Sequence, residues 1–210
     1  MLLSRKQLAV SGAASTEENR MAINCIRINA DGKIQATDGH IAVIFTPGET
    51  LDEKEFPSIE GLTVADDSTL AEQLVPFSLH RDSCATISKT IPKKSRMPIL
   101  NLARLDVVQT NKNGCAVIGV TDLESPQVLR PKKLDMQFPN MSKVEPQGDP
   151  ALIVGIGIEA LEKLIKTLKA LEMKNFKLSL YGNETGPMAI DACNSAGDSV
   201  HCLLMPCLID

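Results

Sequence analysis

The sequence is poor in aromatic residues: it has no tryptophan, one tyrosine and five phenylalanines, and aromatics make up 3% of its 210 residues. Proteins that bind single-stranded nucleic acid stack bases on aromatic side chains, so this composition argues against that class. No stretch approaches the roughly 20 apolar residues that a membrane-spanning helix needs. Residues 1–6 place their charges after their apolar residues, an order that argues against a signal peptide.

The sequence also lacks a strong charge imbalance and any metal-binding cysteine spacing. Its net charge is −4, with 43% apolar and 23% charged residues, which is typical of a globular protein of one or two domains. Any nucleic-acid contact must therefore come from a local basic face. The closest pair among the six cysteines, Cys202 and Cys207, has four residues between its members, and Cys25 and Cys115 lie in apolar segments. We expect buried free thiols in a reducing cytoplasm, without disulfides, metal or other cofactor.

The last sixty residues show the clearest pattern, a strand, a helix and three more strands. Apolar residues recur every three or four positions over 158–173 and predict an amphipathic helix. Its other side carries three lysines and two glutamates. The strands are expected at 151–154, 176–180, 188–192 and 200–205.

The same order of elements occurs twice upstream. In the first segment, Ser4 and Gln7 have the form of a capping box that starts a helix running toward Ala14. Asp31-Gly32 predicts a hairpin turn, and strands are expected at 22–29, 33–37 and 41–45. In the second segment Pro92 ends the predicted helix. That segment has its helix at 81–91, strands at 75–79, 99–108, 115–120 and 127–129, and a turn at 111–114.

Two connectors separate these segments. The first, 47–74, is acidic and contains a predicted short helix at 69–74, and the second, 138–150, contains three prolines. The sequence therefore predicts three repeats, at 1–74, 75–150 and 151–210, in an α+β fold with antiparallel sheets. A single repeat would leave sheet edges exposed, so repeats should pair side by side. The same order of elements also arises by chance in α+β proteins.

The sequence contains one enzyme-like motif. Residues 155–160 fit G-x-G-x-x-A, a dinucleotide-binding fingerprint, but no alternating strand–helix pattern follows them. The three histidines, His40, His80 and His201, have no serine or cysteine partner at a nucleophile elbow. We therefore expect a protein that is not an enzyme, and keep a dinucleotide enzyme as an alternative.

Three motifs together resemble the sliding clamp of bacterial DNA polymerase III, its β subunit. Residues 33–40 (KIQATDGH) resemble the family's ATDGHR turn, 138–146 (FPNMSKVEP) its FPDYRRVxP segment, and 201–208 (HCLLMPCL) its C-terminal YLVMPMRL. Phe56-Pro57 and 97–101 (MPILN) are similar to further clamp segments. The motifs occur in the family's order on matching elements, and the resemblance covers most of the chain.

The sequence departs from the family in length and at motif positions. Family clamps carry three domains, each a pair of repeats, whereas three repeats make one and a half domains. Family rings total twelve repeats, so three per chain would give four chains. Ile41 replaces the arginine after the histidine, Met141 replaces a tyrosine, and Cys207 alters the C-terminal motif. These changes bear on which peptide would bind.

The resemblance implies that helices face duplex DNA, where cations would meet phosphates without reading bases. Ordinary solvated helix faces are the alternative, and Glu159 and Glu162 favour it for the third helix. The candidate DNA-binding residues are Arg5, Lys6, Arg81, Lys89, Lys93, Lys94, Lys163, Lys166 and Lys169.

The resemblance also implies a pocket in which polymerases or repair proteins insert a short apolar peptide. Proline and methionine form an adaptable apolar cleft. Gly39 would leave room for close approach of a backbone. Alternatively, Leu204 and Met205 are core strand residues and 37–39 is only a turn. The candidate pocket residues are Thr37, Gly39, His40, Pro139, Lys143, Val144, Leu204, Met205 and Pro206.

The first hypothesis is therefore a sliding-clamp-like processivity factor that forms a homo-oligomer, binds duplex DNA regardless of sequence and tethers replication or repair proteins. It would act away from membranes. The second is a clamp relative that serves as a protein-binding module without encircling DNA. The third, an unrelated enzyme, predicts a deep pocket near Gly155.

Overall fold

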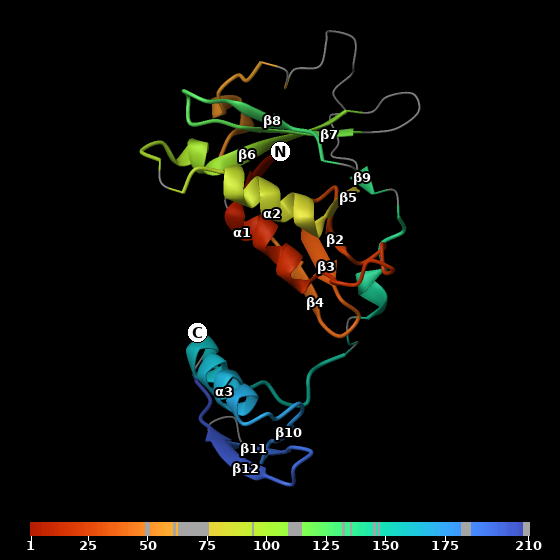
Figure 1. Cartoon of the computed structure of the whole chain (residues 1–210), viewed down its shortest axis with the longest axis vertical. Helices are drawn as coiled ribbons and strands as arrows, with labels where there is room; N and C mark the ends of the chain where they lie inside the picture. The colour runs from red at the N-terminus through yellow and green to blue at the C-terminus, as the bar shows by residue number, and fades with distance from the viewer. Residues whose placement is uncertain are drawn as a thin grey trace. The chain divides into compact units, whose positions relative to one another are not determined.

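The computed structural model describes residues 1–48, 51–60, 62, 76–93, 95–108, 115–131, 133–134, 136–144, 146, 148–181 and 186–207. The chain divides into two compact units, Met1–Glu145 (unit 1) and Pro146–Asp210 (unit 2), which are described separately below (Figure 1). No helix among these residues is both long and apolar enough to cross a membrane.

Unit 1 contains two antiparallel sheets and two main helices. One sheet has the order β1 (Leu2–Ser4), β6 (Leu102–Val108), β7 (Cys115–Val120), β8 (Gln127–Leu129). The other has the order β4 (Ala42–Phe45), β3 (Ile34–Thr37), β2 (Cys25–Ile28), β5 (Phe77–His80), β9 (Lys133–Leu134). The helical segments are α1 (Arg5–Ala9), its 3-10 continuation η1 (Val10–Ala13), η2 (Glu53–Glu55), α2 (Arg81–Thr90), η3 (Pro98–Asn101) and η4 (Met141–Lys143).

The two repeats of unit 1 exchange their first strands. Strand β1 precedes α1 but pairs with β6, the first strand after α2, with Ser4 opposite Leu102. In the same way β5 precedes α2 but pairs with β2, the first strand after the α1 helix, with His80 opposite Cys25. Each sheet therefore contains strands of both repeats, and neither sheet is complete without the other repeat.

One apolar core joins both sheets and both helices of unit 1. Leu8 of α1 and Ile87 of α2 pack with residues of β2, β3, β5, β6 and β7. Strand β1 alternates, so Leu3 lies in this core while Leu2 lies in a second cluster on the opposite face of its sheet. Phe56, Ile59 and Leu62 of the connector cover that opposite face.

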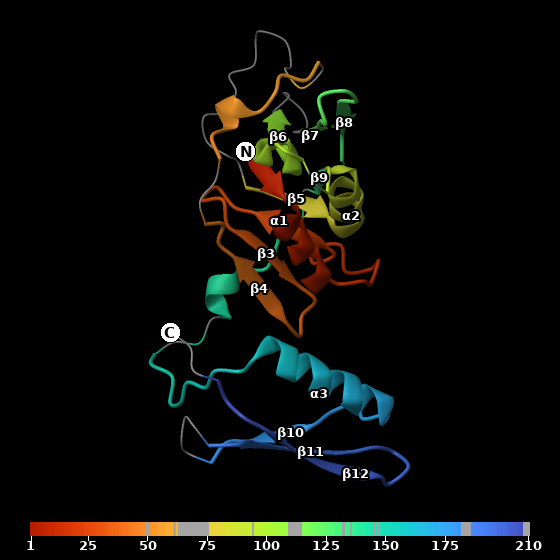
Figure 2. The same cartoon turned by 90° about the vertical axis from the view of Figure 1, so that its left-hand side faces the viewer.

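Unit 2 is one helix on one face of a three-stranded antiparallel sheet (Figure 2). Helix α3 (Ile158–Ala170) lies on the order β10 (Lys177–Ser179), β11 (Met188–Cys193), β12 (Ser199–Leu204). Leu168 packs with Met188, Ile190 and Leu204, so the predicted apolar stripe forms the core. A Schellman motif ends the helix: Met173 N–H donates to the Leu168 carbonyl at 2.9 Å.

Most predicted elements are present with shifted ends, and a few predictions are wrong. The helix predicted over 158–173 ends at Ala170, because Glu172 adopts a left-handed φ of 57° in the Schellman motif. Residues 151–154 form no strand. Residues 99–101 belong to η3, which Pro98 begins. Strand β9 had no sequence signal. The predicted helix at 69–74 and the turn at 111–114 lie outside the described residues.

Five cysteines of the described part of the chain are free, namely Cys25, Cys84, Cys193, Cys202 and Cys207, but not all of them are buried. Cys25 and Cys84 are buried as expected, and burial raises the pKa of Cys84 to about 12. Cys193 and Cys207 are exposed, so the expectation of buried thiols is wrong for these two. Cys193 is exposed because it alternates to the outer face of β11.

Gly119 of β7 provides a test of the connector packing. A Cβ atom at Gly119 would lie 2.4 Å from Leu62 Cδ1, so the Gly119→Ala substitution forces the packed side chains of the connector to shift. We expect a loss of about 1–3 kcal/mol in the free energy of unfolding, measured by urea denaturation. Gly12→Ala is the control, since its Cβ would meet nothing within 4 Å. Equal stability of the two variants would contradict this account of the packing.

Candidate functional site

The helices of unit 1 lie antiparallel and are tied together at both ends. The N-caps Ser4 and His80 place Arg5 and Arg81 at the first position of α1 and of α2. The Arg5 guanidinium donates to the carbonyl of Ile91 at the end of α2, and Arg81 Nη1 donates to the Ser15 carbonyl at 3.3 Å. A cation at a helix C-terminus also interacts favourably with the helix dipole. Both predicted DNA-binding arginines therefore have partners inside the unit.

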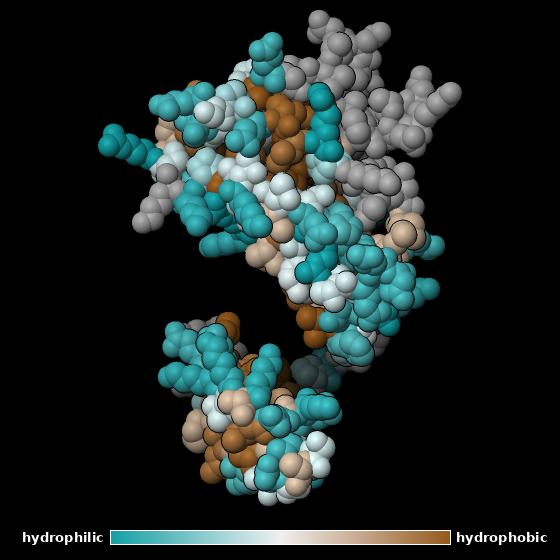
Figure 3. All heavy atoms as spheres, viewed as in Figure 1, coloured by the Kyte–Doolittle hydropathy of each residue, from teal (hydrophilic) through white to brown (hydrophobic). Residues whose placement is uncertain are grey.

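Three lysines of the helix pair lie at its surface. Lys6, Lys89 and Lys93 have exposed side chains, whereas Lys94 lies outside the described residues. The sequences of α1, η1 and α2 contain one acidic residue, Asp82. In Figure 3 the surface over these helices is hydrophilic to neutral. The exposed face of the helix pair is therefore weakly basic although the chain as a whole is acidic.

Helix α3 of unit 2 carries the other predicted cations. Lys163, Lys166 and Lys169 are exposed. Lys166 Nζ lies 2.7 Å from Glu162 Oε1, an exposed pair four residues apart along the helix. Such a pair is worth only a few tenths of a kcal/mol, so Lys166 can exchange this partner for another anion. The acidic residues lie toward the start of the helix and the lysines toward its end.

The predicted turn after β3 is held by its own side chains. Asp38 Oδ1 accepts the backbone N–H groups of His40 at 2.8 Å and Ile41 at 2.9 Å, and these bonds lower the pKa of the Asp38 carboxyl. Thr37 Oγ1 donates to the Ile41 carbonyl at 2.6 Å. Gly39 has a φ of 93°, a conformation that favours glycine. Gly39 and His40 are exposed while Thr37 is buried.

The same turn recurs after β7. Thr121 Oγ1 accepts the Leu123 N–H at 2.9 Å, as Thr37 Oγ1 accepts the Gly39 N–H at 3.0 Å. Asp122 Oδ1 accepts two backbone N–H groups, which lower the pKa of its carboxyl. Leu123 has a φ of 79°, where the first turn has glycine. The two turns therefore share three hydrogen bonds, one accepted by the threonine hydroxyl and two accepted by the aspartate carboxylate.

The remaining predicted pocket residues belong to different parts of the chain. Pro139 lines a hollow of about 340 Å³ in unit 1 together with Arg27 and Gln35. Lys143 and Val144 lie at the end of η4 and are exposed. In unit 2, Leu204 is a core residue, Met205 is 61% exposed and Pro206 is partly buried. The predicted pocket combines residues of both units, so it stays a prediction.

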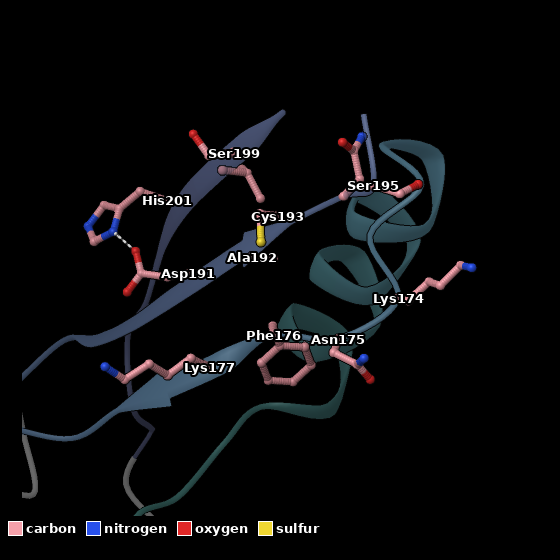
Figure 4. A pocket seen from close by; sticks show the side chains of 12 residues that line it. Lys174, Asn175, Phe176, Lys177, Asp191, Ala192, Cys193, Ser195, Ser199 and His201 are labelled. Carbon is pink, nitrogen blue, oxygen red and sulfur yellow. Dashed lines mark hydrogen bonds and ion pairs between the residues drawn. The ribbon is translucent and has the colours of Figure 1, made fainter. Parts of the chain in front are cut away.

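Unit 2 contains a hollow that no sequence motif indicated. It encloses about 730 Å³ beside β10, β11 and β12, and includes Phe176 and Cys193 (Figure 4). On its rim His201 Nδ1 lies 2.6 Å from Asp191 Oδ1. Gly155 does not line it, so this hollow is not the pocket that the dinucleotide hypothesis predicts. Within the described part of the chain, no three histidine, cysteine or acidic side chains group as a metal site would.

Comparisons with known proteins identify the fold. No protein-family model and no curated protein matches the sequence. Among solved structures, the chain is similar to the β sliding clamp of C. crescentus, with 16% identity and a TM-score of 0.62 over 98% of this chain. It is also similar to the β subunit of Streptococcus pyogenes DNA polymerase, with 14% identity and a TM-score of 0.63 over 99%. A third similar structure is the Pseudomonas aeruginosa DNA polymerase sliding clamp, with 15% identity and a TM-score of 0.60 over 98%.

The chain therefore has the sliding-clamp fold, which confirms the predicted α+β architecture with antiparallel sheets. It spans about half the length of these clamps, since it covers 50% of each of their chains. At these identities the similarity concerns the fold alone.

The two equivalent turns of unit 1 predict that its free energy of unfolding decreases at acid pH. Folding lowers the pKa values of the Asp38 and Asp122 carboxyl groups, so their ionised forms stabilise the folded unit. This stabilisation is fully present above the ordinary aspartate pKa of about 4 and is lost as pH falls through the lowered values. In the Asp38→Asn/Asp122→Asn variant, the amide oxygens can accept the same hydrogen bonds without titrating. We expect urea denaturation between about pH 5 and pH 2 to show a shallower loss of stability than in the parent. The control variant Glu18→Gln, at an exposed side chain, should leave the pH dependence of stability as in the parent. The same pH dependence in the aspartate variant as in the parent would refute the prediction.

Proposed function

We propose that this chain is a sliding-clamp-like processivity factor that binds duplex DNA regardless of sequence and tethers replication or repair proteins. The observation that carries the proposal is the clamp fold over 98% of the chain, together with exposed lysines on each of its main helices. No catalytic step is assigned to it. The cytoplasmic location expected from the sequence is part of the proposal.

The charges of the helices fit binding to phosphates rather than to bases. Duplex DNA presents about one negative charge per 1.7 Å of its axis, and lysines that neutralise these charges release counterions. Lys6 of α1, Lys89 of α2 and Lys93 beyond the end of α2 are exposed, and Asp82 is the one acidic residue in the sequences of these two helices. Ammonium groups on flexible stems position a protein on the duplex without reading its sequence. The net charge of −4 would keep DNA away from the rest of the surface.

Encircling a duplex would take several copies of the chain. Each chain supplies half the length of the solved clamps that it matches. The four-chain ring, expected from three repeats per chain, is accordingly part of the proposal. It requires contacts between chains in addition to the DNA-facing helices.

A protein-binding module is the second candidate function. The observation that favours it is the exposure of apolar residues at predicted pocket positions, Val144 at 68% and Met205 at 61%. A module of this kind would bind apolar peptides and ignore DNA. Binding of an apolar partner peptide by a protein that does not bind the duplex at any salt concentration would distinguish the module from the clamp.

Charge reversal on the helices tests the DNA proposal. We expect the Lys6→Glu/Lys89→Glu variant, and separately Lys163→Glu/Lys166→Glu/Lys169→Glu, to weaken binding of a ~30-base-pair duplex strongly at low salt. The slope of log affinity against log salt should fall by about 0.9 for each lost phosphate contact. Fluorescence anisotropy over about 50–200 mM KCl measures both quantities.

The matched control for Lys6→Glu/Lys89→Glu changes the charge by the same amount but away from the helices. Lys33→Glu/Lys54→Glu alters one lysine after the β2–β3 turn and one in η2. This control should bind DNA nearly as the parent does. If both double variants lose affinity equally, net charge rather than the helix face governs binding. If the parent protein does not bind the duplex at any salt concentration, the proposed clamp function is wrong.

A further inference from the structure

Unit 2 contains one repeat of the kind that occurs twice in unit 1. The helix N-caps, Ser4, His80 and Gly157, align the three repeats residue by residue. By this alignment residues 154–157 correspond to the strands β1 and β5 that open the repeats of unit 1, and β10 corresponds to β2 and β6. Unit 2 can therefore be compared with a complete pair.

The strand exchange that completes unit 1 has no counterpart among the described residues of unit 2. There, residues 154–157 form no strand and β10 is an edge strand. One side of the opening segment is held, because Cys207 N–H donates to the Gly155 carbonyl at 3.0 Å. That bond corresponds to the pairing of Ser78 with β9 in unit 1. The other side of the segment and the edge of β10 are the two surfaces that the second repeat covers in unit 1.

Apolar side chains are exposed around this edge. Leu178 of β10 lies opposite the buried Ile190, so it points to the helix side of the sheet, yet it is 43% exposed. Phe176 and Leu180, two residues away on either side, are 41% and 45% exposed. Figure 3 shows hydrophobic residues at the surface of unit 2. Helix α3 alone thus leaves the β10 part of the sheet uncovered.

Ile158 marks where a second helix would lie. It occupies the position of Arg5 and Arg81, which reach across to the end of the neighbouring helix in unit 1. Ile158 is 83% exposed, more than any other large hydrophobic side chain of the described residues. Leu171, at the other end of α3, is 44% exposed. In an antiparallel helix pair, the start of one helix meets the end of the other, so these two apolar residues would meet.

The charges of α3 are complementary to those of a second α3. Its first half contains Glu159, Glu162 and Lys163 and so has a charge of −1, whereas its second half contains Lys166 and Lys169 and has a charge of +2. Antiparallel pairing about a two-fold axis would bring the acidic half of each helix against the basic half of the other. The same axis would pair the opening segment of each copy with β10 of the other copy. Such reciprocal contacts define an isologous interface.

We infer that unit 2 pairs with unit 2 of a second copy of this chain by exchanging the opening segment 154–157, which forms a shared domain built like unit 1. The register follows from His80 opposite Cys25 and Ser4 opposite Leu102. Gly157 should lie opposite Lys177 of the second copy, and Ile156 opposite Leu178. This inference deepens the proposed homo-oligomer, but the pairing involves no DNA and is tested without it.

The first test is the mass of the full chain in the absence of DNA, by sedimentation equilibrium over a range of concentrations. We expect a dimer or a multiple of it, and an at least ~10-fold weaker association in Ile158→Glu. Glutamate suits a first helical turn, so α3 should still form, which circular dichroism checks. Leu203→Glu is the matched control, since Leu203 is 65% exposed on the outer side of β12, and it should associate as the parent does.

The second test fixes the register by a disulfide. Directly opposed residues of antiparallel strands have Cα atoms about 4.5–5.5 Å apart, within reach of a disulfide. In a background with Cys193→Ser and Cys207→Ser, Gly157→Cys/Lys177→Cys should yield an oxidised dimer on a denaturing gel. Gly157→Cys/Ser199→Cys should not, because Ser199 lies on the other edge strand.

Three results would overturn the inference: a monomer at every concentration, a dimer unaffected by Ile158→Glu, or a cross-link confined to one chain. The last result would mean that the opening segment 154–157 pairs with β10 of its own chain. A dimer that forms in this register but does not bind DNA would support the inference and contradict the proposed function. DNA binding by a protein whose unit 2 does not self-associate would support the proposed function and contradict the inference.

Discussion

The exchange of opening strands is the constraint on which the rest of this structure depends. A repeat of strand, helix and three strands cannot complete its own sheet. The strand before its helix pairs with the strand that follows the helix of the other repeat. In unit 1 the second repeat is supplied by the same chain, and the helices, the core and the connector packing follow from that pairing. In unit 2 the described residues contain one repeat, whose strand β10 is an edge strand with exposed apolar neighbours.

This constraint connects the fold to the proposed function. The exchange places α1 and α2 side by side and antiparallel, with Arg5 and Arg81 joining their ends. The arginines are thereby occupied, and the lysines are left to face solvent. A basic helix face on an acidic chain is the property that a protein sliding on DNA needs, since strong attraction over its whole surface would hold it in place. A shared unit 2 domain would supply the contact between chains that an encircling ring also requires.

Local sequence signals predicted much of this structure. The capping box at Ser4 and Gln7 forms as expected, and the Asp31-Gly32 turn joins β2 to β3. The apolar period of α3 forms its core face. Thr37 and Asp38 shape a turn by hydrogen bonds within a few residues. The sequence also contained the matching Thr121-Asp122, but a leucine where glycine is usual concealed the second turn.

By itself the sequence determined where most of the helices, strands and turns lie, because capping, periodicity and turn chemistry act between residues a few positions apart. Only the tertiary structure decided that Leu3 pairs opposite Ala103, one hundred residues away, and that 154–157 is left without a strand partner in the described unit. The physical reason is that the backbone N–H and C=O groups of every strand are alike. Which strands pair is therefore decided by which apolar faces are buried together, and that is settled only when the whole core assembles.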